Sequence, residues 1–171
     1  MSDLPAQSGL GSSSSFTVGL LHSLSTMQNI YKTKKELAYD AIKIENDILK
    51  ENIGCQDQVA CSFGGLNYIR FEKNRSINVE QIFLNNDNLE KFQNSFILVF
   101  TNLQRNANQT AKEQIIRIKN NSNDDYLREI SNLTKFAKNE IFSKKKLDFD
   151  RIGEALNEHW KIKKKLAKNI S

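Results

Sequence analysis

The chain has 171 residues, of which 39% are hydrophobic and 26% are charged, so it can bury one or two modest cores but not those of a large multidomain assembly. Its 25 Lys and Arg against 20 Asp and Glu give a formal net charge of +5. The mean hydropathy is -0.55 and no apolar run approaches the roughly 20 residues that a spanning helix needs, so no membrane partner is expected.

The N-terminal segment 1–15 contains no basic stretch followed by an apolar one, so the sequence predicts no secretory signal and a cytoplasmic location. In that compartment Cys55 and Cys61 are expected to be reduced thiols rather than a disulfide. The histidines His22 and His159 are not at ligand-like spacing from the cysteines, so no structural zinc site is expected.

Three helices are predicted in the first third of the chain. The first follows the serine-rich stretch that ends at Ser15, because apolar residues recur there at helical spacing. They are Phe16, Val18, Leu20, Leu21, Leu24 and Met27. An amphipathic helix is predicted over 33–50, ending near 52–54, and a short one from about Asp57 to a glycine stop at 64–65.

Strand signals appear in the middle of the chain and helix signals after it. Residues 66–83 favour a hairpin, and the apolar run within 95–101 favours a strand buried on both faces. Good helix formers then predict three further helices, over 105–119, 124–144 and 148–168. The predicted class is α+β, a mixed sheet with packed helices.

The segment Gly9–Ser15 carries the clearest chemistry. Glycines let the backbone approach a ligand, and serines cap a following helix while offering hydroxyls to phosphate oxygens or a metal. No lysine follows Gly11, so this is not the Walker-type loop, and backbone N–H groups, the helix dipole and a cation would offset a phosphate's charge. The local string alone is also compatible with a flexible Gly/Ser tail.

Three elements, in this order, resemble the GHMP kinase superfamily of galactokinases, homoserine kinases, mevalonate kinases and phosphomevalonate kinases. Pro5–Ser15 is similar to its second motif, a proline followed by Gly-Leu-Gly-Ser-Ser and small residues. Gly54–Gln58, with Phe-Gly-Gly at 63–65, is similar to the segment that carries the catalytic aspartate. Glu45 lies twelve residues before Asp57, where such kinases often have a magnesium-binding glutamate.

Within the superfamily, the motifs are most similar to those of the D-glycero-D-manno-heptose 7-phosphate kinases. The resemblance implies the central part of a two-layer kinase fold. The first motif is expected before residue 1 and the third after residue 171, so the chain is interpreted as a truncated piece. Residues 1–65 would carry the phosphate loop and the catalytic aspartate of the N-terminal domain, and residues 66–171 would lead into the C-terminal domain.

By this resemblance the loop binds ATP, and one hydroxyl and one carboxylate bind Mg²⁺. Ser13 and Glu45 are the implied magnesium ligands, a chemistry that suits an ion that prefers oxygen. Asp57 is the implied catalytic residue, which would orient the acceptor hydroxyl and accept its proton. The implied nucleotide-binding residues are Gly9, Leu10, Gly11, Ser12, Ser13 and Ser14.

Each acid also has an ordinary structural interpretation. Glu45 could be a solvated acid on a helix face, paired with Lys43 or Lys50. Asp57 could be a helix N-cap, a role compatible with catalysis. Both interpretations remain open from the residues alone.

Two basic features bear on the choice of partner. Arg105, after the predicted strand, could bind the phosphate of a sugar substrate, because guanidinium matches phosphate geometry, or could be an ordinary surface arginine. The lysines near Trp160 are interpreted as a solvated helix face, so no nucleic-acid partner is expected. They are Lys161, Lys163, Lys164, Lys165 and Lys168.

The function expected from the resemblance is ATP-dependent phosphorylation of the anomeric hydroxyl of D-glycero-D-manno-heptose 7-phosphate, a step of carbohydrate metabolism. A GHMP kinase acting on another small-molecule alcohol is one alternative. A truncated remnant or ligand-binding protein that keeps the fold without phosphoryl transfer is the other. The sequence does not fix the oligomeric state.

Overall fold

The computed structural model describes residues 11–51, 54–99, 114–118, 120, 122–143 and 147–167. These residues are mainly helical, with one two-stranded antiparallel sheet, so the predicted α+β class is confirmed. They form two compact units that divide between Gln81 and Ile82. No helix within the described ranges is both long and apolar enough to span a bilayer.

The first helix of the N-terminal unit, α1 (Ser12–Met27), begins directly after Gly11. Gly11 has a left-handed φ of 67°, which glycine adopts without the steric penalty of a Cβ. The chain can therefore turn sharply into the helix. The predicted helix is confirmed, but it begins at Ser12, inside the serine-rich stretch rather than after it. Helix α2 (Lys34–Ile42) begins at a capping box formed by Thr33 and Glu36.

A π-helix, η1 (Lys43–Ile48), continues directly from α2. The N–H of Leu49 donates to the carbonyl of Ile44 at 2.9 Å, five residues back. The amphipathic helix predicted over 33–50 is therefore confirmed over Lys34–Ile48, but its second part is a π-helix, and it ends before the predicted end at 52–54. Apolar residues three or four apart do not distinguish an α-helical turn from the wider π-helical turn.

Helix α3 (Gln56–Phe63) and the hairpin that follows complete this unit, and both predictions are confirmed. The helix stops at Gly64, which has a φ of 65°. Strands β1 (Asn67–Phe71) and β2 (Ile77–Gln81) pair antiparallel, with Ile69 opposite Val79.

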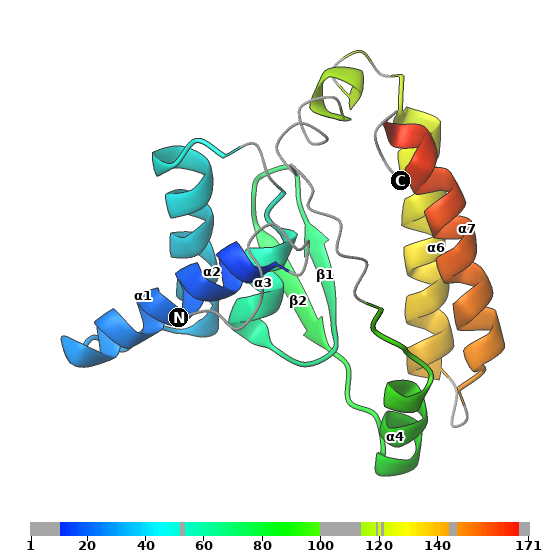
Figure 1. The fold of residues 1–171 in the computed structure, drawn as a ribbon, viewed down its shortest axis with the longest axis horizontal. Coiled ribbons are helices and arrows are strands. Elements are labelled where there is room, and N and C mark those ends of the chain that lie inside the picture. The colour runs from blue at the N-terminus through cyan, green and yellow to red at the C-terminus, as the bar shows by residue number, and fades with distance from the viewer. Residues whose placement is uncertain are drawn as a thin grey trace. The chain divides into compact units, whose positions relative to one another are not determined.

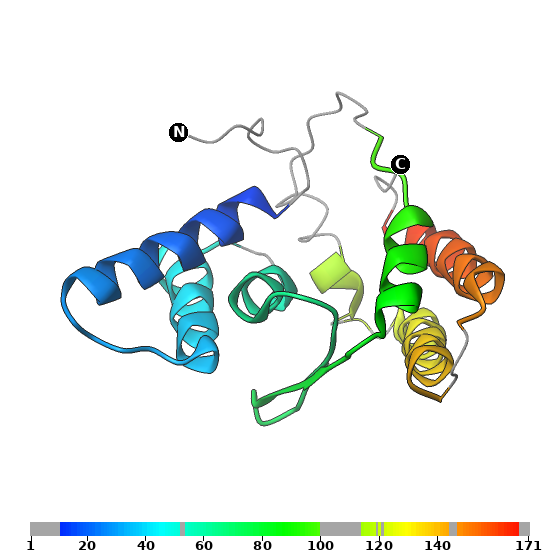
Figure 2. The same ribbon diagram turned by 90° about the horizontal axis from the view of Figure 1, so that it is seen from below.

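The core of this unit joins three elements through Ala38 of α2, Val59 of α3 and Ile77 of β2. Four partly buried apolar residues pack against it: Ile42, Phe63, Ile69 and Val79. Figure 1 shows α1 crossing α2 with its N-terminal end beside α3, and Figure 2 shows α3 between α2 and the hairpin. Contacts of α3 with α1, α2 and β1 thus fix its first turn next to the start of α1.

The second unit contains α4 (Asn86–Asn94), α6 (Asp124–Ser143) and α7 (Phe149–Leu166), and residues 114–118 are also helical. Helices were predicted over 105–119, 124–144 and 148–168, and these predictions are confirmed where the residues are described. Helix α4 was not predicted. Its signal is Asn85, whose side chain accepts a hydrogen bond from the N–H of Asn88 and caps the helix.

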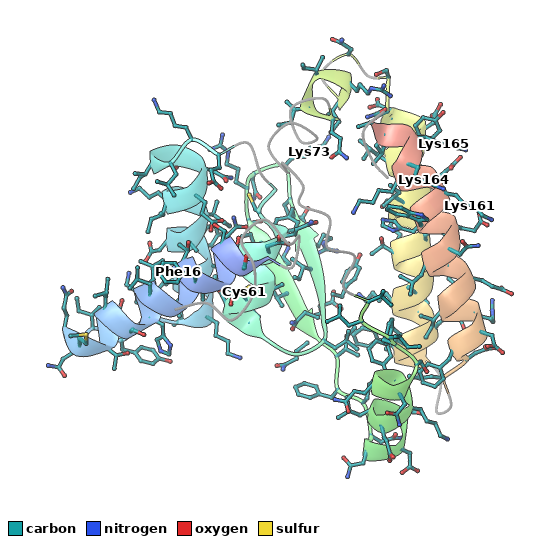
Figure 3. All side chains as sticks on the ribbon, in the orientation of Figure 1. Phe16, Cys61, Lys73, Lys161, Lys164 and Lys165 are labelled. Carbon is teal, nitrogen blue, oxygen red and sulfur yellow. The ribbon has the colours of Figure 1, made fainter. Side chains whose placement is uncertain are left out.

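Helices α6 and α7 pack against each other as a helical hairpin (Figure 1). Arg151 of α7 pairs with the buried Glu140 of α6 at 3.1 Å and lies over the ring of Phe136. Figure 3 shows the lysines 161, 164 and 165 on the last turns of α7. Each of these three lysines is exposed, as expected of a solvated face.

The strand predicted over 95–101 is wrong for its described part, Ser95–Val99, which is not in a strand. Ile97, Leu98 and Val99 are 87%, 82% and 71% exposed. An apolar run forms a buried strand only if neighbouring strands pair with it, whereas β1 and β2, the strands in the described ranges, pair with each other.

Candidate functional site

The candidate site lies where α1 begins. The carbonyl of Gly11 accepts the N–H of Ser15 at 2.9 Å, which closes the first turn of the helix. The helix has no side-chain cap hydrogen bond at this end. Because the first N–H groups of an α-helix have no partner within the helix, this terminus offers donors and the positive end of a dipole.

Asp57 lies at this terminus, although it is distant from it in sequence. It occupies the first turn of α3 and its side chain is exposed. A Cβ built on Gly11 would lie 3.6 Å from Asp57 Oδ2. The predicted loop and the predicted catalytic acid are thus neighbours in the structure.

Glu45 is the buried acid of the site, with no exposed surface. Its Oε1 accepts the hydroxyls of Ser13 at 3.3 Å and Thr17 at 3.0 Å. Its Oε2 accepts the hydroxyl of Ser14 at 2.9 Å and the Nε2 group of Gln58. Four hydrogen bonds from α1 and α3 therefore converge on one carboxyl group of η1.

This arrangement answers the structural alternatives for both acids. Glu45 is not a solvated acid paired with Lys43 or Lys50, because it is fully buried against α1 and α3. Asp57 is not the N-cap of α3, because Cys55 holds that position and makes no side-chain cap hydrogen bond. The structure thus excludes the lysine pairing of Glu45 and the N-cap role of Asp57.

The donor set around Glu45 fits a magnesium ion. All four donors to the carboxyl group are neutral, and a buried charge is costly without a countercharge. Ser13 is exposed, so an oxygen-binding cation could approach its hydroxyl. The described residues contain no group of three or more His, Cys, Asp or Glu able to hold a metal.

Cys61, labelled in Figure 3, lies one turn further along α3, a helix that contacts α1. Burial raises the pKa of its thiol, the negative charge of Asp57 raises it further, and a hydrogen bond with Ser15 acts in the opposite direction. The thiol therefore responds to the charge at the site.

The remaining predicted residues divide by whether the structure describes them. Gly11, Ser12, Ser13 and Ser14 form the start of α1, whereas Gly9, Leu10 and Arg105 lie outside the described residues. Thr17 and Gln58 were not predicted as site residues. The signal for Thr17 was its place one helical turn after Ser13; for Gln58 it was adjacency to Asp57.

Comparison with known proteins shows what the segment around this site is similar to. Residues 1–65 match the family described as the GHMP kinases N terminal domain. The site thus lies in a GHMP-kinase-type segment, and the resemblance found in the sequence is confirmed.

The chain is similar, in particular, to the D-glycero-alpha-D-manno-heptose 7-phosphate kinase of Campylobacter jejuni subsp. jejuni. The two are 28% identical over 170 residues, which is 99% of this chain and 49% of the relative. A crystal structure of a Campylobacter jejuni protein assigned as a sugar kinase matches with a TM-score of 0.66 and 28% identity, over 92% of this chain and 43% of that one. The chain thus spans about half the length of the curated relative.

Proposed function

We propose that this chain contributes the nucleotide-binding and catalytic corner of an ATP-dependent sugar-phosphate kinase. The observation that carries the proposal is the convergence of Gly11, Glu45 and Asp57 at the start of α1. Phosphoryl transfer needs little covalent chemistry from a protein and depends on positioning and charge. The residues that position the phosphates, the cation and the acceptor therefore determine the rate of transfer.

In this proposal the segment from Gly9 to Ser14 holds the phosphates of ATP through backbone N–H groups at the positive end of α1. Ser13 and Glu45 hold Mg²⁺. When bound, the ion would offset charge on the phosphate oxygens during transfer. The neutral donors around Glu45 support this assignment, because a cation at Ser13 supplies the countercharge that the described cluster lacks.

Asp57 is the proposed catalytic residue. Its carboxylate orients the acceptor hydroxyl and accepts its proton as the γ-phosphoryl group is transferred. The role requires an acid that is accessible to a second substrate yet fixed beside the phosphate site. Asp57 meets both requirements, because it is exposed and lies against Gly11.

The proposed acceptor is the anomeric hydroxyl of D-glycero-D-manno-heptose 7-phosphate, in the cytoplasm. This acceptor is supported by the relative that is 28% identical over 99% of this chain, which is named a kinase of this heptose 7-phosphate. Arg105 is proposed to contact the phosphate already on the sugar. In a complete kinase, 1–65 would belong to the N-terminal domain and 66–171 would lead toward the C-terminal one.

The experiment measures ADP release from ATP, Mg²⁺ and the heptose 7-phosphate, together with nucleotide affinity by calorimetry. Asp57→Asn is expected to lower transfer by at least about 100-fold while Mg²⁺-ATP affinity stays within about twofold. Asp87→Asn is the matched control, since Asp87 is also an exposed acid in the first turn of a helix, α4. Equal transfer by the wild type and Asp57→Asn would refute the catalytic role.

A second candidate is a nucleotide-binding protein without transfer, which the Glu45 cluster at the start of α1 would support on its own. This candidate predicts Mg²⁺-ATP binding that depends on Glu45, with no ADP release from any sugar phosphate. Transfer to a different small alcohol would instead keep the kinase and change only its acceptor.

A further inference from the structure

Gln58 is the buried polar residue of the site that the proposed chemistry does not use. It has no exposed surface, and its Nε2 group donates to Glu45 Oε2. Its Oε1 atom is also buried and has no hydrogen-bond partner among the described residues. A buried acceptor without a donor costs about 1–3 kcal/mol, so a stronger interaction must hold the amide in this orientation.

That interaction is the bond to Glu45. Turning the amide over would place its oxygen against a carboxylate oxygen, and two acceptors repel each other. A bond from an amide to a charged acceptor is also stronger than one between neutral groups. Glu45 therefore sets the orientation of the Gln58 amide, and the Gln58 amide in turn restricts the orientation of the Glu45 carboxyl group.

The backbone around Gln58 is held in place by Ser62 and by the core of the unit. Its backbone carbonyl accepts the hydroxyl of Ser62 at 2.8 Å, and its neighbour Val59 is fully buried in the hydrophobic core. Its other neighbour, Asp57, points out toward Gly11. Two adjacent residues of α3 therefore face the two parts of the site: Asp57 lies against Gly11, and Gln58 donates to Glu45.

We infer that Gln58 is a positioning residue that holds the Glu45 carboxyl group in its metal-binding orientation and ties it to the helix turn that carries Asp57. The inference rests on the proposed function. Ser14 and Gln58 donate to Oε2, whereas Oε1 accepts the hydroxyls of Thr17 at 3.0 Å and of the exposed Ser13 at 3.3 Å, so Oε1 is the oxygen on the side of Ser13, the residue proposed to share the cation. Residues that orient a metal ligand typically change metal affinity by about 10- to 100-fold when they are removed.

The test measures the dissociation constant of a non-hydrolysable ATP analogue for the 171-residue chain, with and without Mg²⁺. The wild type is expected to bind more tightly with Mg²⁺. Gln58→Met, which keeps the length of the side chain and removes the donor, is expected to shrink that gain by about 10-fold or more and leave metal-free affinity within about twofold.

Two controls separate positioning from stability. Ser62→Ala removes the other hydrogen bond of Gln58 without touching Glu45, so it lowers stability but keeps the full Mg²⁺ gain. Gln93→Met makes the same substitution at an exposed site on α4 and changes neither quantity. A merely structural role for Gln58 would make Gln58→Met behave like Ser62→Ala, and that result would overturn the inference.

A measurement on the wild type covers the case in which Gln58→Met does not fold. The Nε2 proton of Gln58 that faces Glu45 is expected to exchange slowly with solvent and to shift when Mg²⁺ and the analogue are added, whereas those of Gln93 are not. A Gln58 amide that exchanges as fast as Gln93 overturns the inference. Absence of any Mg²⁺ gain in the wild type overturns the proposed function together with the inference, whereas a gain unaffected by Gln58→Met overturns the inference alone.

Discussion

The carboxyl group of Asp57 lies against the backbone of Gly11, so that a Cβ added to the glycine would be 3.6 Å from Oδ2 and 3.7 Å from Cγ. The two residues belong to different helices, α1 and α3, and meet at the first turn of each. The left-handed turn at Gly11 thus directs the chain into α1 at the point where Asp57 lies against it.

The conformation of Gly11 gives the first prediction. Gly11→Ala is expected to destabilise the N-terminal unit by about 1 kcal/mol, because a left-handed φ costs a residue with a Cβ about 1–2 kcal/mol. Space is not the obstacle, since 3.6 Å is an ordinary contact. Hydrogen exchange of the α1–α3 amides measures the change.

Gly19→Ala is the matched control in the same helix. A Cβ at Gly19 meets nothing within 4 Å, and alanine in a helix interior is favoured over glycine by about 0.5–1 kcal/mol. The same exchange experiment should therefore show protection rising in this variant. Equal effects at the two positions would contradict the role of the left-handed turn.

The buried cluster around Glu45 gives the second prediction. Glu45→Leu is expected to cost about 2–6 kcal/mol, because the buried donors of Ser14 and Gln58 would each lose an acceptor at about 1–3 kcal/mol. Glu45→Gln should cost only about 1 kcal/mol, since its carbonyl can face those donors while its NH₂ group faces hydroxyls that can accept.

Urea unfolding followed by far-UV circular dichroism measures both Glu45 variants. Trp160 lies in the second unit, so its fluorescence serves as an internal control that should not change. Asp47→Asn alters an exposed acid of the same π-helix and is expected to shift stability by less than about 0.5 kcal/mol. A loss in Glu45→Leu no larger than in Asp47→Asn would show that the cluster contributes nothing.

Much of the N-terminal unit was predictable because its signals are local. Gly11 and the serines after it mark the start of α1, and Gly64 marks the end of α3. The polar break between two alternating runs predicted the hairpin that pairs Ile69 with Val79. Each of these features depends on residues within a few positions of one another.

The errors come from features that depend on distant residues. The apolar run that contains Ile97 reads as a buried strand, yet strand formation depends on partners that no local pattern supplies. The π-helical turn at Glu45 and the burial of Gln58 depend on how α1 and α3 pack, which spacing does not encode. Motif resemblance singled out Glu45 and Asp57, whereas Gln58 required the structure.

The thiol of Cys61 gives the third prediction, a report of the charge on Asp57 that needs no ligand. Burial raises the pKa of this thiol and the charge of Asp57 raises it further. In a Cys55→Ser background, Asp57→Asn is expected to lower the pKa of Cys61. Its alkylation by iodoacetamide at pH 8 should then accelerate on the order of two- to fivefold, the size of one charge acting partly through solvent.

Asp87→Asn in the same background is the control for Cys61, because Asp87 belongs to the other unit and is not among the causes of the thiol's shift. Its alkylation rate should match that of the parent. If both substitutions change the rate equally, the effect reflects net charge, and the placement of Asp57 beside α1 would lose this support.

The capping box of α2 gives the fourth prediction. Hydrogen bonds from the backbone N–H of Thr33 at 2.8 Å and from its hydroxyl at 2.7 Å lower the pKa of Glu36 below its ordinary value of 4.5. Because the folded pKa lies below the unfolded one, this acid contributes stability above the unfolded pKa and loses that contribution as the pH falls through the folded pKa.

Thr33→Ala removes the hydroxyl and keeps the backbone donor, which is the larger of the two causes. The pKa of Glu36 should therefore rise but stay below 4.5, and α2 should lose less stability between pH 5 and the acid transition than it does in the wild type. Carbon-detected NMR titration of the Glu36 carboxyl group measures the pKa directly.

Thr26→Ala is the control. It removes an exposed hydroxyl that donates to the carbonyl of His22 in its own helix, and it should leave the titration of Glu36 unchanged. A Glu36 titration that is the same in the wild type and in Thr33→Ala would mean that the hydroxyl of Thr33 does not bond the carboxylate in solution, since the backbone donor is present in both proteins.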